Sequence, residues 1–211
     1  MGSSGIFMTE RFIKELEIKL KGNLPGKEAQ EIMAPTVRFQ GNKFPNPDLS
    51  KPSGVLILLF PSVGDWSTVF IKRTSFGLHG GQISLPGGKM EDNDIDIKAT
   101  ALREAMEEIG SDPFKIKVIG QLTPLHVPHS NFRITPFVGF LEEVPVLQQN
   151  EREVQAIIRI RLTELFDMKN RGIKTFNRSG NTIQAPYYNA KGHVVWGATA
   201  MIISEFEALV E

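Results

Sequence analysis

Apolar residues recur at two different spacings along the chain, and each spacing predicts a different kind of element. Between residues 10 and 21 they return every three or four positions, which predicts an amphipathic helix capped by Thr9. The same spacing predicts a helix from Ile97 to Ile109, and Gly110 is a typical residue to end it. A closing helix is predicted over residues 196–210.

Shorter apolar runs predict strands between these helices. Val55–Phe60 is one, and because Gly64-Asp65 predicts a turn, Thr68–Lys72 is expected to return beside it as a hairpin. Ile134–Leu141 is predicted as a strand broken by Pro136. Further strands are predicted over residues 115–123, 153–161, 182–188 and 193–196. Interleaved strands and helices predict the α/β class, with a mixed sheet flanked by helices.

Composition narrows the class of protein. The 211 residues are 41% hydrophobic and 23% charged, which is typical of one globular domain. Basic and acidic residues number 24 each, and this balance argues against a nucleic-acid partner, whose binding usually needs a basic excess. Cysteine is absent, so disulfides and thiolate metal sites are excluded.

The chain is expected to hold one domain with a short lead-in. Residues 1–7 contain a Gly-Ser run that we take as a cloning remnant, and residues 8–53 are predicted to form an N-terminal helix and an irregular lead-in packed on the domain at 54–211. No apolar run approaches the roughly 20 residues that cross a bilayer, so no membrane association is expected. With no signal peptide recognised, a cytoplasmic protein is predicted.

The helix predicted over residues 97–109 groups its acidic side chains. At about 100° per residue, Glu104, Glu107 and Glu108 share one side. The opposite side is predicted to be apolar and to face the core, with Leu102, Ala105, Met106 and Ile109. Like charges four residues apart destabilise a helix, and the nearest cation is Arg103. A hard divalent cation would make such a cluster favourable, which favours a metal site over a solvated acidic face.

Two glycines precede this helix, at Gly87 and Gly88. A backbone without side chains can bring a carbonyl close to a metal ion or let a phosphate approach. Most Gly-Gly pairs are only turns, so the pair gains weight here from its distance to the acidic helix.

The spacing of these residues resembles the Nudix box, in which Gly, Glu, Arg-Glu, Glu-Glu and Gly follow at fixed intervals. The matching residues are Gly88, Asp94, Arg103-Glu104-Ala105, Glu107-Glu108 and Gly110. Asp94 stands where the first Glu is expected, and eight residues rather than seven separate it from Arg103. Ser111 replaces the usual final aliphatic residue.

The departures themselves resemble the coenzyme A pyrophosphatase branch of the Nudix hydrolases. The segment His79–Gly88 is similar to that branch's His-x-Gly-Gln-Ile-Ser-Phe-Pro-Gly-Gly, with Leu85 for Phe. Gly120–Leu125 and Trp196–Ala200 resemble it as well, whereas Lys72-Arg73-Thr74 only approximates the branch's Arg-Ser pair. The resemblance implies the Nudix fold, a mixed β-sheet sandwiched between α-helices, from about residue 54 onward.

The resemblance also implies a reaction, the metal-dependent hydrolysis of the pyrophosphate bond of coenzyme A or a derivative, giving 3′,5′-ADP and 4′-phosphopantetheine. It implies a set of ligands for Mg²⁺ or Mn²⁺, namely Glu104 and Glu108 first, Glu107 directly or through water, and a carbonyl of Gly87 or Gly88. Arg103 would orient the loop and the glutamates through Asp94.

The general base and the substrate contacts are less closely defined. Glu153, just before a predicted strand, is our candidate base, with a box glutamate or Glu151 as alternatives. Five residues at or before the glycines are candidate substrate contacts, namely Lys72, Arg73, His79, Gly81 and Gln82. For the basic residues among them, a solvated strand end or turn packing is the competing interpretation.

Other functions stay open at this stage. The substrate could instead be ADP-ribose, a dinucleotide or a nucleoside triphosphate. A non-catalytic domain that binds a nucleotide as a sensor is a second alternative, although such domains tend to lose box glutamates. The apolar stripe of the N-terminal helix either packs on the domain or joins two chains in a homodimer.

Overall fold

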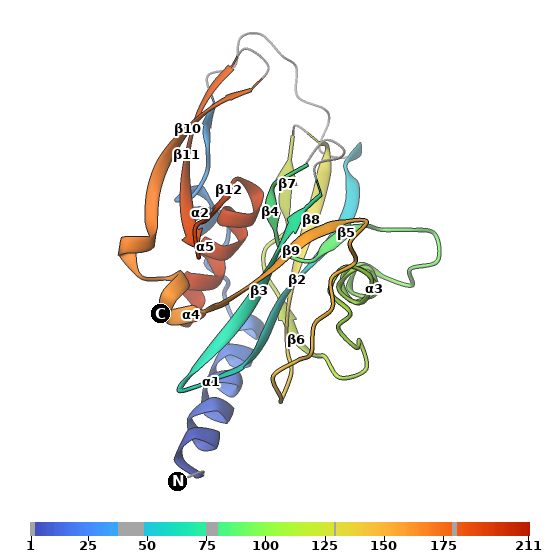
Figure 1. Ribbon diagram of the computed structural model, residues 1–211, viewed down its shortest axis with the longest axis vertical. Helices are drawn as coiled ribbons and strands as arrows, with labels where there is room; N and C mark the ends of the chain where they lie inside the picture. The colour runs from blue at the N-terminus through green and yellow to red at the C-terminus, as the bar shows by residue number, and fades with distance from the viewer. Residues whose placement is uncertain (1–2, 38–48, 75–79, 129, 179–180) are drawn as a thin grey trace.

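The computed structural model describes residues 3–37, 49–74, 80–128, 130–178 and 181–211. Helix α3 lies on one side of the larger of two β-sheets, and α1 and α5 lie on the other side (Figure 1). The helices are α1 (Ser3–Lys21), α2 (Gly26–Glu31), α3 (Ile97–Ile109), α4 (Leu162–Leu165) and α5 (Ala198–Val210), with a 3₁₀ turn η2 (Met168–Asn170).

The larger sheet has eight strands in the described part of the chain, in the order β4-β3-β2-β8-β6, with β5 beside β2, β7 beside β8 and β9 beside β3. Its strands are β2 (Lys51–Ser62), β3 (Asp65–Arg73), β4 (Ile83–Ser84), β5 (Gly87–Lys89), β6 (Lys117–Gln121), β7 (Leu125–Val127), β8 (Phe132–Phe140) and β9 (Val154–Arg161). Strands β2 and β8 are parallel and the other pairs are antiparallel, so the sheet is mixed, as predicted.

The smaller sheet has four described strands, ordered β1-β11-β10 with β12 beside β11. They are β1 (Thr36–Val37), β10 (Arg171–Arg178), β11 (Asn181–Ala190) and β12 (His193–Trp196). The sequence patterns predicted β11 and β12 but not β10, whose residues mix polar and apolar side chains without regular alternation.

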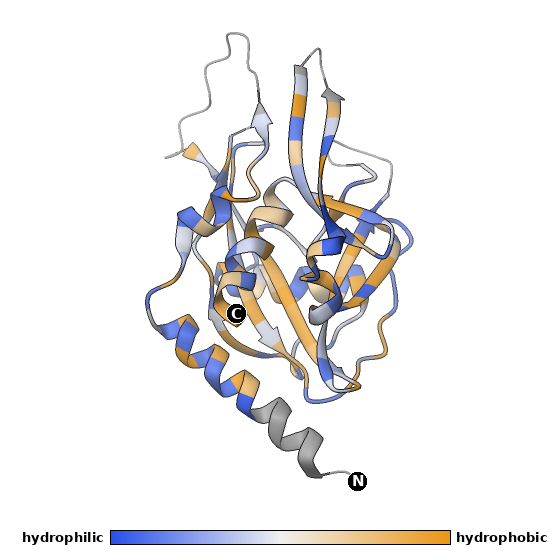
Figure 2. Cartoon of the chain, turned by 90° about the vertical axis from the view of Figure 1, so that its left-hand side faces the viewer, coloured by the Kyte–Doolittle hydropathy of each residue, from blue (hydrophilic) through white to orange (hydrophobic). Residues whose placement is uncertain are grey.

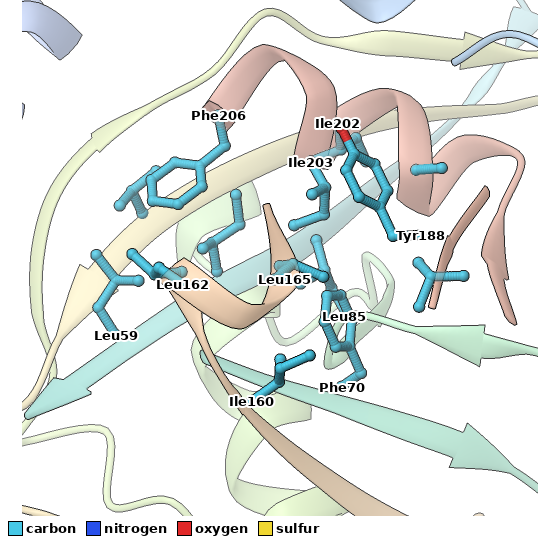
Figure 3. Packing of buried hydrophobic residues seen from close by; sticks show 14 of the residues in the cluster. Leu59, Phe70, Leu85, Ile160, Leu162, Leu165, Tyr188, Ile202, Ile203 and Phe206 are labelled. Atoms are coloured by element: carbon cyan, nitrogen blue, oxygen red, sulfur yellow. The ribbon is translucent and has the colours of Figure 1, made fainter. Parts of the chain in front are cut away.

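Strand β2 is the centre of the fold because both of its faces are covered. Leu56 and Leu58 pack in a cluster with α3, whereas Ile57 and Leu59 pack in the cluster on the opposite face. This two-sided burial explains why the strand is a continuous apolar run rather than an alternating one. Figure 3 shows the second cluster, where residues of β3, β9, α4 and α5 meet around Phe70, Leu165 and Phe206.

The predicted hairpin is confirmed, because β2 and β3 pair antiparallel with Phe60 opposite Ser67. Gly64, in the connecting turn, has a φ of 68°, a conformation that favours glycine. The prediction that Pro136 breaks its strand was wrong, because β8 runs through it. β6 pairs with β8 from Phe137 onward and β7 pairs with it up to Ile134, so the missing N–H of Pro136 falls between the two partners.

The N-terminal helix is longer than predicted. It begins at Ser3, so Thr9 lies inside α1 and is not its cap. Residues 3–8 contain no proline, so no residue there prevents the helix from extending toward the N-terminus. The segment predicted to be irregular contains α2, β1 and the start of β2. Leu16 and Leu20 of α1 are buried in the cluster that includes α5, and a Cβ at Gly120 of β6 would lie only 2.8 Å from the Leu20 Cβ. The apolar stripe of α1 therefore packs on the domain.

Hydropathy follows this arrangement. In Figure 2 the central strands are mostly hydrophobic, while the coloured part of α1 alternates between hydrophobic and hydrophilic residues. Among the described helices, none combines the length and the apolar character that crossing a bilayer requires.

Candidate active site

Helix α3 spans the predicted residues, and both ends are fixed by local contacts. The side chain of Asp96 caps the start by accepting from the Ala99 N–H, and Gly110 ends it in the left-handed conformation. The helix lies close to the sheet because Gly54 of β2 has no side chain: a Cβ there would come within 2.4 Å of the Ile97 carbonyl oxygen. Glycine at this position thus lets α3, which carries the acidic residues, lie close against β2 and its neighbour β5.

The predicted orientation of α3 was partly wrong. Met106, expected in the core, is 48% exposed, whereas Glu108 is fully buried. Ala101 and Ala105 share the buried side of the helix with Glu108, because positions three and four apart lie on one face. The carboxylates Glu104 and Glu108 consequently point toward β5 rather than away from the sheet.

Glu108 is held between a backbone group and a guanidinium. Its Oε2 accepts from the Gly87 N–H at 2.9 Å and its Oε1 accepts from Arg73 Nη1 at 3.0 Å. Burial raises the pKa of Glu108 to about 7, against the lowering effects of the Gly87 N–H and the Arg73 charge. The negative charges of Glu104 and Glu153 contribute to this rise, so three carboxylates act on one small region.

Glu104 lies directly on the bare backbone of Gly88. A Cβ on Gly88 would come within 2.3 Å of Glu104 Oε1, so only glycine leaves room for the carboxylate in this place. Burial raises the pKa of Glu104, and Arg103, whose Nη1 donates to Oε1 at 3.0 Å, opposes this rise. Glu107 is 43% exposed and accepts from the same Nη1 at 3.1 Å.

Arg103 ties the acidic helix to the loop before it. Its Nε and Nη2 donate to the two oxygens of Asp94, at 2.9 and 3.0 Å, and Nη2 also reaches the Lys89 carbonyl at 3.3 Å. Asp94 accepts in addition from Thr100 Oγ1 and the Glu91 N–H, both at 2.9 Å. The Arg103 guanidinium holds the pKa of Asp94 well below its usual range. This is the contact through which Arg103 was expected to act.

The remaining candidate residues surround the end of β3. Glu153 lies just before β9, where its carbonyl accepts from the Thr74 N–H at 2.9 Å. Gly81 has a φ of 73°, and its N–H donates to the Arg73 and Thr74 carbonyls, both at 3.2 Å. The Gln82 carbonyl accepts from the Arg73 N–H at 3.0 Å.

One of the predicted substrate contacts, Lys72, lies apart from this network. Lys72 is held in β3 between Ile83 of β4 and Ala156 of β9, and its neighbour Arg73 is the cation that reaches the buried carboxylate. His79 lies outside the described residues.

Comparison with known proteins identifies the family. A family model of the NUDIX domain matches residues 50–178, more than half of the chain. The chain belongs to the Nudix family. The predicted Nudix fold is thereby confirmed, and so is the prediction of an enzyme, a Nudix hydrolase acting on pyrophosphate bonds of nucleotide-like substrates.

Two curated relatives support this assignment, and one solved structure shares the fold. The uncharacterized Nudix hydrolase NudL of Photorhabdus laumondii is 35% identical over 146 residues, which cover 68% of this chain and 78% of NudL. Nudix hydrolase 22, chloroplastic, of Arabidopsis thaliana is 36% identical over 182 residues, covering 82% of this chain. Those residues span only 57% of the Arabidopsis protein, little more than half its length. A MutT/nudix family protein from Enterococcus faecalis shares the fold, with a TM-score of 0.51 over 82% of this chain and 66% of its own, at 15% identity.

Nudix hydrolases generally use divalent metals such as Mg²⁺ or Mn²⁺. Within the described ranges, no three His, Cys, Asp or Glu side chains form a ready-made metal cage. The atoms available to a metal ion are nevertheless carboxylate and carbonyl oxygens, which are hard ligands. The Glu104 carboxylate lies where a Cβ on Gly88 would be, so it is in contact with the bare backbone. Such a set fits Mg²⁺ or Mn²⁺ held by one or two carboxylates with the substrate's phosphates.

Sequence reasoning missed one group in this Nudix site. Ser53 of β2 is buried, and its Oγ donates to the Gly88 carbonyl at 2.7 Å. It lies 35 residues before Gly88 and next to Gly54, and no local pattern marks a serine in a buried strand as part of a site. Only the pairing of β5 with β2 brings the two together.

Proposed function

We propose that this Nudix hydrolase cleaves the pyrophosphate bond of coenzyme A or its derivatives, giving 3′,5′-ADP and 4′-phosphopantetheine. The observation that carries the reaction class is the placement of two carboxylates on bare backbone, with the buried Glu108 on the Gly87 N–H and the partly buried Glu104 on Gly88. The substrate class rests on the segment His79–Gly88, which resembles the coenzyme A branch and leads directly into that backbone.

The glutamates are proposed to bind the metal ion, and the pair of Arg103 and Asp94 to orient them. Glu104 and Glu108 would hold the Mg²⁺ or Mn²⁺, with Glu107 joining directly or through water and a carbonyl of Gly87 or Gly88 as a further ligand. When bound, such an ion neutralises diphosphate oxygens and acidifies water. Arg103, anchored on Asp94, fixes the carboxylates of Glu104 and Glu107, so that they are placed before the substrate arrives.

Glu153 is the proposed general base. Its charge raises the pKa of both Glu104 and Glu108, which supports a position beside them, and it lies on a different element from the proposed metal ligands. A carboxylate so placed can accept the proton of the attacking water while the ligands stay ionised. A box glutamate remains the alternative base.

Arg73 is the proposed phosphate contact. Its side chain is 33% exposed while it pairs with Glu108, so one part of the guanidinium is available to an incoming phosphate oxygen. Lys72, Gly81, Gln82 and His79 complete the proposed substrate contacts. We also propose that the partner is a small nucleotide rather than a nucleic acid, in keeping with the balanced charge, and that the protein is cytoplasmic.

The test is an incubation of the purified enzyme with Mn²⁺ and, in separate reactions, coenzyme A, ADP-ribose, NADH and nucleoside triphosphates, with identification of the products. Formation of 3′,5′-ADP and 4′-phosphopantetheine from coenzyme A is expected. Glu104→Gln serves as the control for a contaminating hydrolase. Cleavage of ADP-ribose alone would overturn the substrate and keep the reaction class, whereas no cleavage of any of them would overturn both.

A further inference from the structure

A concave surface apart from the candidate active site lies along β9 and the turn between β11 and β12. It encloses about 580 Å³. Its walls come from the loop before β9, from β9 itself and from the hairpin turn, and include Leu147, Gln149, Ile157, Arg159, Lys191 and His193. None of the catalytic candidates described above lines it.

The cavity is basic. Arg159, Lys191 and His193 all line it, and none of the described residues that line it is acidic. Within the described part of the chain, no carboxylate forms an ion pair with any of the three. Arg159 instead lies over the Phe60 ring, with its guanidinium carbon 6.0 Å from the ring centre. Basic groups that converge on a hollow without partner acids favour an anion there.

The basic turn is a well-defined element. Lys191 and Gly192 have φ values of 52° and 86°, and the Gly192 N–H donates to Asn189 Oδ1 at 2.7 Å. His193 follows as the first residue of β12, paired with Ala190 across the turn. The turn also lies outside residues 50–178, which match the Nudix family.

The cavity is connected to the catalytic helix but lies too far away to take part in cleavage. Gln149 lies between two residues bonded to α3: the Gln148 N–H donates to the Ile109 carbonyl and the Asn150 N–H to the Glu108 carbonyl. Arg159 lies six residues beyond Glu153, which corresponds to about 20 Å along an extended strand. A group held by Arg159 is thus separate from the reacting anhydride.

We propose that this cavity binds a phosphate-bearing group through Arg159, Lys191 and His193. The aliphatic side chains of Leu147 and Ile157 contact the less polar part of the molecule that carries the phosphate. The phosphate belongs to a molecule separate from the substrate, because the 3′-phosphate of coenzyme A sits on the ribose that carries the scissile pyrophosphate and cannot reach a cavity about 20 Å away.

Binding is tested without turnover by titrating inorganic phosphate into the full chain and following backbone amide signals by NMR. Saturable shifts are expected at Lys191, Gly192 and His193. The double variant Arg159→Gln, His193→Gln should weaken binding by about tenfold or more, because two charge-capable donors are lost. Arg161→Gln, exposed at the end of the same strand and outside the cavity, is the matched control and should bind as the unaltered protein does. No saturable shift at the turn, or full binding by the double variant, would overturn the site.

The source of the phosphate is decided by comparing coenzyme A with dephospho-coenzyme A, which lacks the 3′-phosphate. If the substrate instead supplied the group, the double variant would raise KM for coenzyme A by about tenfold with kcat unchanged and leave KM for dephospho-coenzyme A as it was, and this result would overturn the separation of the cavity from the cleavage site. If KM changes for neither while phosphate binding is lost, the ligand is a separate phosphorylated molecule. Failure to cleave either compound would refute the proposed substrate and leave the binding result standing.

Discussion

Two fully buried glutamates, Glu108 and Glu205, differ in their hydrogen-bond donors and in the charges near them. Glu205 of α5 accepts from the Gly26 and Thr123 N–H groups at 3.2 and 3.1 Å and from Gln30 Nε2 at 2.8 Å. Its three donors are neutral and come from two segments, α2 and the connection between β6 and β7. The carboxylate therefore joins α2, α5 and the connection between β6 and β7.

Glu108 has fewer hydrogen-bond donors than Glu205 and lies near other negative charges. It accepts from one N–H and from the partly exposed Arg73, and two further carboxylates act on it. Burial therefore raises its pKa to about 7, a departure typical of groups kept for chemistry. The contrast separates a structural carboxylate from the proposed metal ligand: both are buried, but only Glu108 combines incomplete hydrogen bonding with crowding by like charges.

The largest expected effect separates these two glutamates by activity. Glu108→Gln should lower Mn²⁺-dependent turnover by about 10³-fold or more, an amount equal to about 4 kcal/mol of barrier, because a neutral amide cannot serve as an anionic metal ligand. The free energy of unfolding should stay the same or rise, because a buried charge next to two others is removed. Kinetics and urea unfolding on the same preparation measure both. Turnover close to that of the unaltered enzyme would remove Glu108 from the site.

Glu205→Ala should have the reverse profile. Three buried donors would lose their acceptor, so the free energy of unfolding should fall by about 3 kcal/mol while turnover per folded molecule is kept. The matched control is Glu31→Ala, an exposed residue in an ion pair with Lys27, which should cost no more than about 0.5 kcal/mol. Equal losses in the two variants would show that Glu205 does not hold the helices together.

The same contrast explains what sequence could predict. The acidic helix was predicted with its bounds, because capping by Gly110 and the spacing of Glu104, Glu107 and Glu108 are local signals within one element. Which side of α3 is buried was not predicted correctly. That depends on Gly54, a glycine in a strand whose absent side chain admits the helix backbone, and on β5 pairing beside it.

Contacts between distant segments were beyond the sequence patterns. Arg73 was expected to meet phosphate, but its pairing with Glu108 depends on β3 being aligned beside the acidic helix. The network around Glu205 left no signal either, since a Glu in an apolar closing helix is indistinguishable from a surface position until α2 is packed against it. The binding cavity at Lys191 and His193 needs β9 and the hairpin to meet, which neither segment indicates alone.

A smaller effect is expected from Gly88→Ala. The added Cβ would meet the end of the Glu104 side chain at 2.3 Å, and because that side chain is flexible, the carboxylate should move rather than the backbone. We therefore expect kcat to fall by about 10- to 100-fold with little loss of stability. Gly22→Ala, where the new methyl meets its nearest atom at an ordinary 3.5 Å, is the control and should leave kcat unchanged. A large drop in stability without a change in kcat would contradict this reading of Gly88.

The smallest expected effect is on the free energy of unfolding when Asp94 is changed, and it is followed as a function of pH. Because Arg103 lowers the pKa of Asp94 below its unfolded value near 3.8, the pair contributes stability that is fully present above that pH and is lost as pH falls through the folded pKa. Asp94→Asn should therefore be less stable than the unaltered protein by about 1–2 kcal/mol at neutral pH, and the gap should narrow below about pH 4. Urea unfolding at several pH values measures the gap, with Asp92→Asn, an exposed neighbour in the same loop, as the control. A gap that stays constant down to the lowest pH would mean that Asp94 supports the loop by shape and not by charge, which would separate the loop anchor from the electrostatics of the carboxylates beside it.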